Sequence, residues 1–280
     1  MVITVIGLGL IGGSIAKRLK LTGFATEVIG VDVNPNHQQE AIELGLVDEV
    51  LPLEEAVKRS SLVIIAIPVD KTVDLVPEVL SLASDNTVVV DMGSTKKVIC
   101  DTADNHPKRM NFVATHPMAG TENSGPTAAD SQLFENKTAI ICDRLKSGKS
   151  AVSLVEQLYA ELNMNVIEME AEDHDVHIAY VSHLSHVISF VLSETVLDKE
   201  KDVKHIFNMA GSGFASTVRL AKSSPDMWTP IFKENAKPIS DVIGTYIDNL
   251  QKFKNMLDTN NSEGVYEVIE RANSIQKVLK

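Results

Sequence analysis

Cysteine and long apolar runs are scarce in this sequence. Its 280 residues include two cysteines, Cys100 and Cys142, and no Cys-x-x-Cys pair, which argues against a disulfide framework and against a zinc knuckle. We expect both to be buried as small apolar side chains in a reducing cytoplasm. The longest strongly apolar run, residues 62–69, is too short to cross a bilayer. The N-terminal residues show no secretion signal, so we expect a cytoplasmic protein without a membrane partner.

Basic charge is also in short supply. The 38 acidic residues outnumber the 26 basic ones, and the formal net charge is -12. A field of this sign repels nucleic acid and anionic lipid, so we expect no nucleic-acid partner. An anionic substrate would need a local basic group to hold it.

The chain changes character near residue 170. Before it, short β-branched runs alternate with helical patterns, which is typical of a Rossmann-type, doubly wound parallel sheet. After it, apolar residues recur at helical spacing and no strand pattern is convincing. We therefore predict an NAD-binding domain over residues 1–169 and an all-α substrate and dimerisation domain over residues 170–280. The predicted strands are 2–6, 27–31, 62–67, 87–91, 111–115, 138–142 and 165–169. The predicted helices are 12–21, 37–44, 71–83, 151–162, 174–197, 203–209, 232–257 and 262–279.

A glycine-rich turn follows the first predicted strand. Gly7, Gly9 and Gly12 match G-x-G-x-x-G between that strand and a helical pattern, which is the context of a dinucleotide site. In such a site the first glycine permits the tight turn and the second lets the backbone approach the pyrophosphate. The third lets the helix pack on the strand. The helix N-terminus then binds the pyrophosphate.

Asp32 indicates which dinucleotide binds. It lies 20 residues after Gly12 at the end of the second predicted strand, where its carboxylate can accept hydrogen bonds from a ribose hydroxyl and repels a 2′-phosphate. No arginine follows it to receive NADP, so NAD is the predicted cofactor. The alternative is a glycine turn that binds nothing. The remaining predicted cofactor contacts are Leu10, Ile11, Pro68 and Gly93.

Two polar segments follow later strands. Ser94 and Lys96 lie in DMGSTK, at the carboxyl end of a strand where doubly wound sheets bind ligands. Ser94 or Thr95 could equally cap the next helix. His116 opens the polar loop THPMAGTENSG. A histidine titrates near neutrality and suits proton transfer coupled to hydride transfer, so His116 is the predicted catalytic base.

Four histidines share the helical segment 174–197. The pairs are His174 with His177 and His183 with His186, and histidine pairs on one helical face can bind zinc. No cysteine cluster supports such a site, so we predict no metal. His183 and His186 lie three residues apart and could line the cleft, although packing at the domain junction is an alternative for one of them.

Arg219 is the candidate anchor for an acidic substrate. It follows the glycine-rich stretch GSGFASTV, and a guanidinium binds a carboxylate bidentately. The alternative is an ordinary surface arginine. We interpret Trp228, the only tryptophan, as a packing residue.

Together these motifs resemble one family. The order GLGLIGGS, VDVNP, DMGSTK, THPMAGTENSG, VSHLSH and GSGFASTVRLAKSSPDMW is similar to the prephenate and arogenate dehydrogenases of tyrosine biosynthesis. The resemblance implies NAD-dependent oxidative decarboxylation of prephenate to 4-hydroxyphenylpyruvate, with hydride leaving C4 and carbon dioxide leaving C1. Arogenate is the alternative substrate. A non-catalytic NAD-binding protein is a second alternative, against which the intact His116, Ser94 and Arg219 argue.

The resemblance also implies residue roles and a homodimer. His116 would accept the hydrogen bond of the substrate 4-hydroxyl, Ser94 would orient His116 and the nicotinamide, and His186 would face the substrate. Arg219 would grip a substrate carboxylate. The remaining predicted substrate contacts are Thr121, Glu122 and His183. Where many relatives have charged residues after the glycine turn, this chain has Ala215 and Ser216, which puts any substrate contact made there in doubt.

Overall fold

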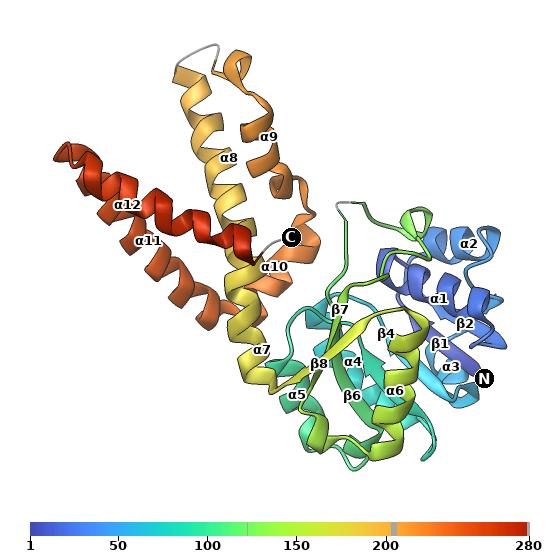
Figure 1. Cartoon of the computed structure of the whole chain (residues 1–280). Helices are drawn as coiled ribbons and strands as arrows, with labels where there is room; N and C mark the ends of the chain where they lie inside the picture. Colours follow the sequence, from blue (N-terminus) through green and yellow to red (C-terminus); the bar gives the residue numbers. More distant parts are fainter. Residues whose placement is uncertain (122, 203–205, 279–280) are drawn as a thin grey trace.

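An eight-stranded sheet forms the first part of the chain in a computed structural model, which describes residues 1–121, 123–202 and 206–278 (Figure 1). The strands are β1 (Val2–Ile6), β2 (Glu27–Val31), β3 (Glu49–Val50), β4 (Leu62–Ile65), β5 (Val88–Asp91), β6 (Phe112–Pro117), β7 (Thr138–Cys142) and β8 (Asn165–Met169). Their order in the sheet is β3-β2-β1-β4-β5-β6-β7-β8. The first six strands have the Rossmann order, which confirms the predicted fold class. Ligands bind such sheets where the order reverses, between β1 and β4.

The direction of β7 departs from the all-parallel expectation. It pairs antiparallel with β6, so that His116 lies opposite Ile140, whereas every other neighbouring pair of strands is parallel. The connection over residues 118–137 begins and ends at the same edge of the sheet, which forces the chain to run back. The polar loop after His116 therefore stays at the carboxyl ends of the parallel strands.

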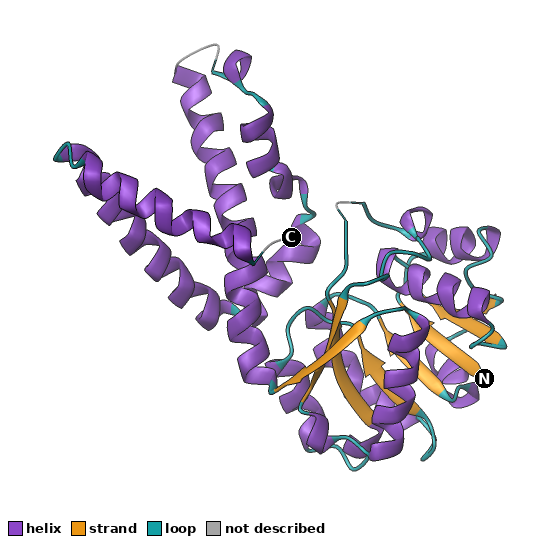
Figure 2. Cartoon of the chain, viewed as in Figure 1, coloured by secondary structure: helices purple, strands orange, loops and turns teal. Residues whose placement is uncertain are grey.

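Helices cover both faces of the sheet (Figure 2). They are α1 (Leu10–Thr22), α2 (Pro35–Glu43), α3 (Leu53–Arg59), α4 (Val69–Leu82), α5 (Lys97–Asp104) and α6 (Lys149–Glu161). One core cluster includes buried residues of α1 and α6, and the other includes buried residues of α4 and α5. The sequence prediction missed β3 and α3 because two and seven residues are too short to show a period.

The chain is helical after Met169 in its described part. The helices are α7 (Ala171–Ile178), α8 (Leu184–Asp202), α9 (Ser212–Thr217), α10 (Pro225–Glu234), α11 (Ala236–Asp258) and α12 (Ser262–Asn273). Between α7 and α8 the segment Ala179–His183 is π-helical. In Figure 1, α8 and α11 diverge away from the sheet, and α12 runs back beside α11.

Three of the predicted helices need correction. The helix predicted over residues 232–257 is interrupted at Asn235, which ends α10 and precedes α11. Its side chain is buried against α7, an interaction that helical periodicity does not reveal. The segment predicted over 203–209 forms only a 3-10 turn at Phe207–Met209, and residues 203–205 lie outside the described part. The last helix gives way to a 3-10 turn at Ser274–Lys277.

The helical stretch Ala171–Lys201 is long and apolar enough, by length and composition alone, to cross a membrane. It nevertheless carries His174, Asp175 and His183, which are buried against the sheet domain and the neighbouring helices. These contacts identify it as the central helix of the second half of the chain.

Candidate active site

Only glycine fits at two positions of the turn after β1. Gly7 has a φ of +93°, and a Cβ atom added there would lie 2.4 Å from the carbonyl oxygen of Ala66. A Cβ atom on Gly12 would lie 1.9 Å from the carbonyl oxygen of Gly7. Nothing lies within 4 Å of a Cβ atom built on Gly9, which leaves its outer side open to a ligand.

The first turn of α1 fits a pyrophosphate. Gly9 is the N-cap, and among the described residues no side chain caps the helix and no acidic residue stands in its first turn. Leu10 and Ile11 open the helix, and their backbone N–H groups belong to the set that an α-helix leaves without an internal acceptor. Free N–H groups together with the helix dipole favour a bound anion at this end.

Asp32 is fixed at the end of β2. Its Oδ2 accepts the N–H of Leu8 at 2.8 Å, and its Oδ1 accepts the N–H of Asn34 at 2.8 Å. The ring Nδ1 of His37 lies 3.6 Å from the carboxylate. These bonds hold the charge beside the glycine turn, where a ribose hydroxyl can donate to it and a 2′-phosphate would be repelled.

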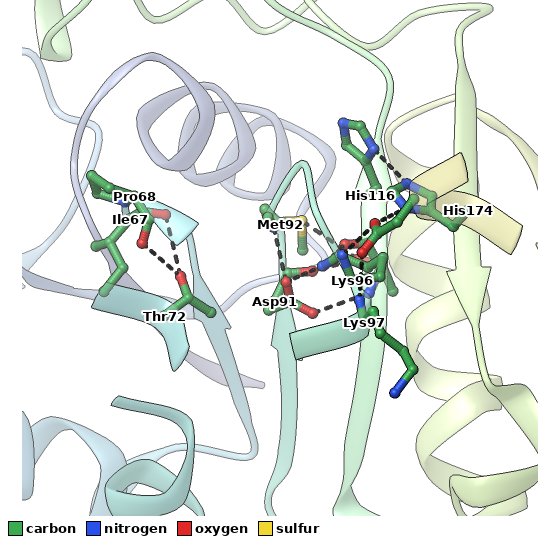
Figure 3. A network of polar contacts seen from close by, with 12 residues as sticks. Ile67, Pro68, Thr72, Asp91, Met92, Lys96, Lys97, His116 and His174 are labelled. Atoms are coloured by element: carbon green, nitrogen blue, oxygen red, sulfur yellow. Dashed lines mark hydrogen bonds and ion pairs between the residues drawn. The ribbon is translucent and has the colours of Figure 1, made fainter. Parts of the chain in front are cut away.

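Pro68 follows β4 and Gly93 follows β5, the next two strands of the sheet after β1. Pro68 is exposed and caps α4, and its carbonyl accepts the Thr72 hydroxyl (Figure 3). Gly93 is buried, and a Cβ atom there would lie 2.9 Å from Asp91 Oδ2. Both positions therefore follow strands at the edge where the predicted cofactor would bind.

A buried ion pair supports the loop after β5. The Nζ of Lys96 contacts the Asp91 carboxylate and donates to the carbonyl of Thr115 at 2.7 Å, with both charged side chains fully buried. Asp91 also accepts the N–H of Gly93 at 2.9 Å. Lys96 thus anchors the loop that carries Ser94. Its place after a strand suggests a side chain available to a ligand, but the structure buries that side chain.

His116 lies in β6 and is 8% exposed. Its Nδ1 is 2.9 Å from the Nε2 of His174, a residue of α7 (Figure 3). Among the described contacts, no hydrogen bond joins Ser94 to it. Burial holds the pKa of His116 well below its usual range, and the nearby His174, Lys96 and His183 act in the same direction. His116 is therefore a neutral imidazole that can accept a hydrogen bond at neutral pH.

Trp228 contacts both candidate histidines of the helical domain, His183 and His186. His183 is buried, meets the Trp228 ring edge-on at 5.8 Å, and has its Nδ1 3.1 Å from the Nδ2 of Asn235. His186 is half-buried and stacks on Trp228 with ring centroids 3.5 Å apart. Burial lowers the pKa of His183 to about 4 and also lowers that of His186, to which the charge of Arg219 contributes. Arg219 therefore lies near His186.

The predicted site residues fall into two groups that meet at the domain junction. The electrostatic influence of His183 reaches His116, and that of Arg219 reaches His186. Arg219 begins the exposed 3-10 turn Arg219–Lys222. Thr121 is exposed in the loop after β6. Glu122 lies outside the described residues.

Sequence reasoning missed three buried polar residues of the site. They are His174, Asp175 and Asn235, all at most 3% exposed. The sequence pairs His174 with His177 as a possible metal site, but His174 is buried against His116, whereas His177, three residues further along α7, is exposed. Among the described residues, no group of three or more potential ligands is placed to hold a metal ion. A His-Asp pair at the start of an otherwise apolar helical stretch was the available signal.

Hydride transfer to a nicotinamide dinucleotide is the chemistry that unites the glycine turn, Asp32 and the buried histidine. The chain is an NAD-dependent oxidoreductase built from a Rossmann domain and a helical domain. Comparison with known proteins identifies the family of oxidoreductases. The family model for the prephenate dehydrogenase nucleotide-binding domain matches residues 15–168, and that for the prephenate dehydrogenase dimerization domain matches residues 170–271. The chain belongs to the prephenate dehydrogenase family.

Individual relatives agree with this assignment. Prephenate dehydrogenase of Bacillus subtilis is 33% identical over 269 residues, which are 95% of this chain and 72% of that protein. Cyclohexadienyl dehydrogenase of Zymomonas mobilis is 30% identical over 99% of this chain and 96% of its own length. The crystal structure of prephenate dehydrogenase from Aquifex aeolicus, in complex with hydroxyphenyl propionate and NAD+, is similar with a TM-score of 0.90 and 29% identity. It covers 100% of this chain and 98% of that one.

Proposed function

We propose that this protein oxidises prephenate to 4-hydroxyphenylpyruvate with NAD, in preference to arogenate. The observation that carries the preference is the charge of the segment 211–222, which leads into and contains the Arg219 turn. It contains Arg219 and Lys222 but no aspartate or glutamate. Both substrates offer carboxylates to these cations, but arogenate also carries an ammonium group, which they would repel and which would find no acid in the segment.

His116 is the proposed hydrogen-bond acceptor for the substrate 4-hydroxyl. Its Nδ1 is occupied by His174, which leaves Nε2 for the substrate. As hydride leaves C4, the hydroxyl oxygen gains positive charge, and sharing its proton with Nε2 stabilises that charge. Bound NAD supplies the hydride acceptor. Loss of carbon dioxide from C1 makes the ring aromatic, and the shared proton remains with the phenol oxygen.

The other site residues have proposed supporting roles. Arg219 binds a substrate carboxylate and His186, held by Trp228, faces the substrate. Ser94 orients the nicotinamide from the loop that Lys96 anchors. Thr121, which is exposed after β6, and its sequence neighbour Glu122 are proposed substrate contacts. The buried His183 supports the helical side of the site through its contacts with Asn235 and Trp228.

The substrate preference is tested by steady-state kinetics with each substrate separately, following NADH formation. We expect kcat/KM for prephenate to exceed that for arogenate by at least about tenfold, equivalent to about 1.4 kcal/mol. Equal values, or a preference for arogenate, would contradict the proposal while leaving the oxidoreductase assignment intact.

We also propose that the protein works as a homodimer joined through its helical domain. The matching model for residues 170–271 is that of a dimerization domain. Exposed apolar residues lie along three of its helices, namely Val191 and Leu197 of α8, Ile247, Leu250 and Leu257 of α11, and Tyr266 and Ile269 of α12. A second copy that covers them would remove this apolar area from water. Light scattering after gel filtration should give twice the mass of one chain. In the Leu250→Glu variant the measured mass should fall to that of a single chain.

We propose that the dimer acts in the cytoplasm. We also propose that it has no membrane or nucleic-acid partner, because its net charge of -12 repels both kinds of polyanionic surface. We also propose that the domain boundary lies between residues 169 and 170, where the sheet ends and the helices begin.

A further inference from the structure

A chain of two hydrogen bonds connects the proposed catalytic histidine to a buried carboxylate. His116 Nδ1 lies 2.9 Å from His174 Nε2, and His174 Nδ1 lies 2.8 Å from Asp175 Oδ1. His174 and Asp175 are 1% and 3% exposed, so water does not compete for these bonds. Figure 3 shows the rings of His116 and His174 turned toward each other at the end of the sheet.

Asp175 is held as an acceptor by the start of α5. Its Oδ1 accepts the N–H of Lys96 at 2.8 Å, and its Oδ2 accepts the N–H of Lys97 at 2.8 Å. These N–H groups lie at the N-terminal end of the helix, where the dipole favours a negative charge. A carboxylate that receives two backbone donors in this way has acceptor sites only. His174 Nδ1 must therefore carry a hydrogen and donate it to Asp175.

The proton positions on both rings follow from this donor. Burial lowers the pKa of His174, so the ring is neutral and its second nitrogen, Nε2, has no hydrogen. Nε2 can then only accept, and His116 Nδ1 must donate to it. Because His116 is also neutral, its Nε2 is left with a lone pair. The other charged or titratable groups near the two rings are Lys96, His183 and Asp91.

We infer that His174 and Asp175 are positioning residues that fix the tautomer of His116, so that Nε2 is the atom available to accept from the substrate. This inference rests on the proposed role of His116. The pair belongs to α7, whereas His116 and the 91–96 loop belong to the sheet domain, so the tautomer is set only where the two domains pack together. The N–H bonds to Asp175 further tie the orientation of His116 to the loop that carries Ser94.

The direct test is the tautomer of His116 in the protein without substrate. Protein labelled with nitrogen-15 at histidine should show, by NMR, a protonated Nδ1 and a bare Nε2 for the signal that disappears in His116→Asn. A wild-type His116 protonated at Nε2 would overturn the inference by itself, whatever the variants do.

Variants connect the tautomer to turnover. His174→Leu removes the acceptor, so a mixture of tautomers should appear and kcat should fall about ten- to a hundredfold, with NAD affinity unchanged. His174→Gln offers an acceptor oxygen to His116 and should recover much of the loss. His177→Leu, on the exposed side of the same helix, is the matched control and should leave turnover unchanged.

The outcomes separate this inference from the proposed function. Unchanged kcat and an unchanged tautomer in folded His174→Leu would overturn the positioning role of His174. Full activity in His116→Asn, with the expected wild-type tautomer, would instead refute the base while leaving the positioning intact. An equal loss of kcat in the Leu and Gln variants, with reduced NAD binding, would mean that His174 is merely structural.

Discussion

The ring of His186 stacks on the indole of Trp228, with centroids 3.5 Å apart and planes inclined by 26°. The same indole meets His183 edge-on. Trp228 also packs with Ile231 and with Val69 at the start of α4. One side chain of the helical domain therefore contacts two candidate site histidines and the edge of the cofactor domain.

Replacing Trp228 should weaken both the fold and the site. Because it is 7% exposed, Trp228→Ala should lower the free energy of unfolding by about 3–5 kcal/mol and should raise KM for prephenate as His186 loses its support. Met227→Ala changes the exposed neighbour and is the control. Urea denaturation and steady-state kinetics measure both effects. A loss of stability with unchanged KM would limit Trp228 to packing.

Replacing Arg219 should mainly affect substrate binding. Arg219→Ala removes a charge-assisted hydrogen bond to a carboxylate and should raise KM by the equivalent of about 1–3 kcal/mol, with a smaller effect on kcat. Lys222→Ala removes an exposed cation from the same turn and should raise KM less, because Lys222 adds only to the positive charge of the segment and makes no proposed direct contact. If the two variants raised KM equally, a general electrostatic attraction would replace the specific contact.

Asp32 should determine the preference for NAD over NADP. Asp32→Asn keeps a side chain that can accept one of the two backbone N–H groups but removes the charge that repels a 2′-phosphate. We expect the ratio of the two dissociation constants to move toward NADP by about 1–3 kcal/mol. Fluorescence titration with each dinucleotide measures this ratio. An unchanged ratio would show that discrimination arises elsewhere.

Acid should destabilise the protein through its buried histidines. The pKa of His183 is about 4 in the folded state against 6.5 for the ordinary group, so the unfolded chain binds the proton more tightly. This contribution to stability is complete above pH 6.5 and is lost as the pH falls toward 4, by about 3 kcal/mol. His116 and His174, whose pKa values are also lowered, act in the same direction.

A pair of variants isolates the share of His183. The free energy of unfolding from urea curves should fall less between neutral pH and about pH 4 in His183→Gln than in the wild type. His177→Gln removes an exposed histidine from the same helical stretch and should follow the wild-type curve. Parallel curves for all three proteins would contradict the assigned cause.

The sequence predicted the Rossmann fold and the glycine-rich turn after β1 because both depend on local patterns. The spacing of Gly7, Gly9 and Gly12 and the position of Asp32 are readable within one βαβ unit. The reversed direction of β7 was not readable, since an apolar strand looks the same in either direction. The break at Asn235 was also hidden, because it depends on a hydrogen bond to the carbonyl of Asp175, 60 residues away in the sequence.

The candidate site was predicted only in part, because several of its contacts join residues that are distant in the sequence. His116 was visible from its place after a strand, but its partner His174 lies 58 residues further along. Lys96 seemed available for a ligand, although its charge is buried against Asp91. The π-helical segment Ala179–His183 changes the helical phase between His174 and His186, which a uniform helical period cannot anticipate.

The central claim is that His116 acts on the reacting hydroxyl, and the kinetics of His116→Asn with prephenate test it most directly. We expect kcat to fall by about a hundredfold or more, as for loss of a general base, while the dissociation constant for NAD stays within a factor of about two. Wild-type kcat should also persist below pH 6.5, because the pKa of His116 is lowered. A variant that turns over prephenate at the wild-type rate would contradict the account.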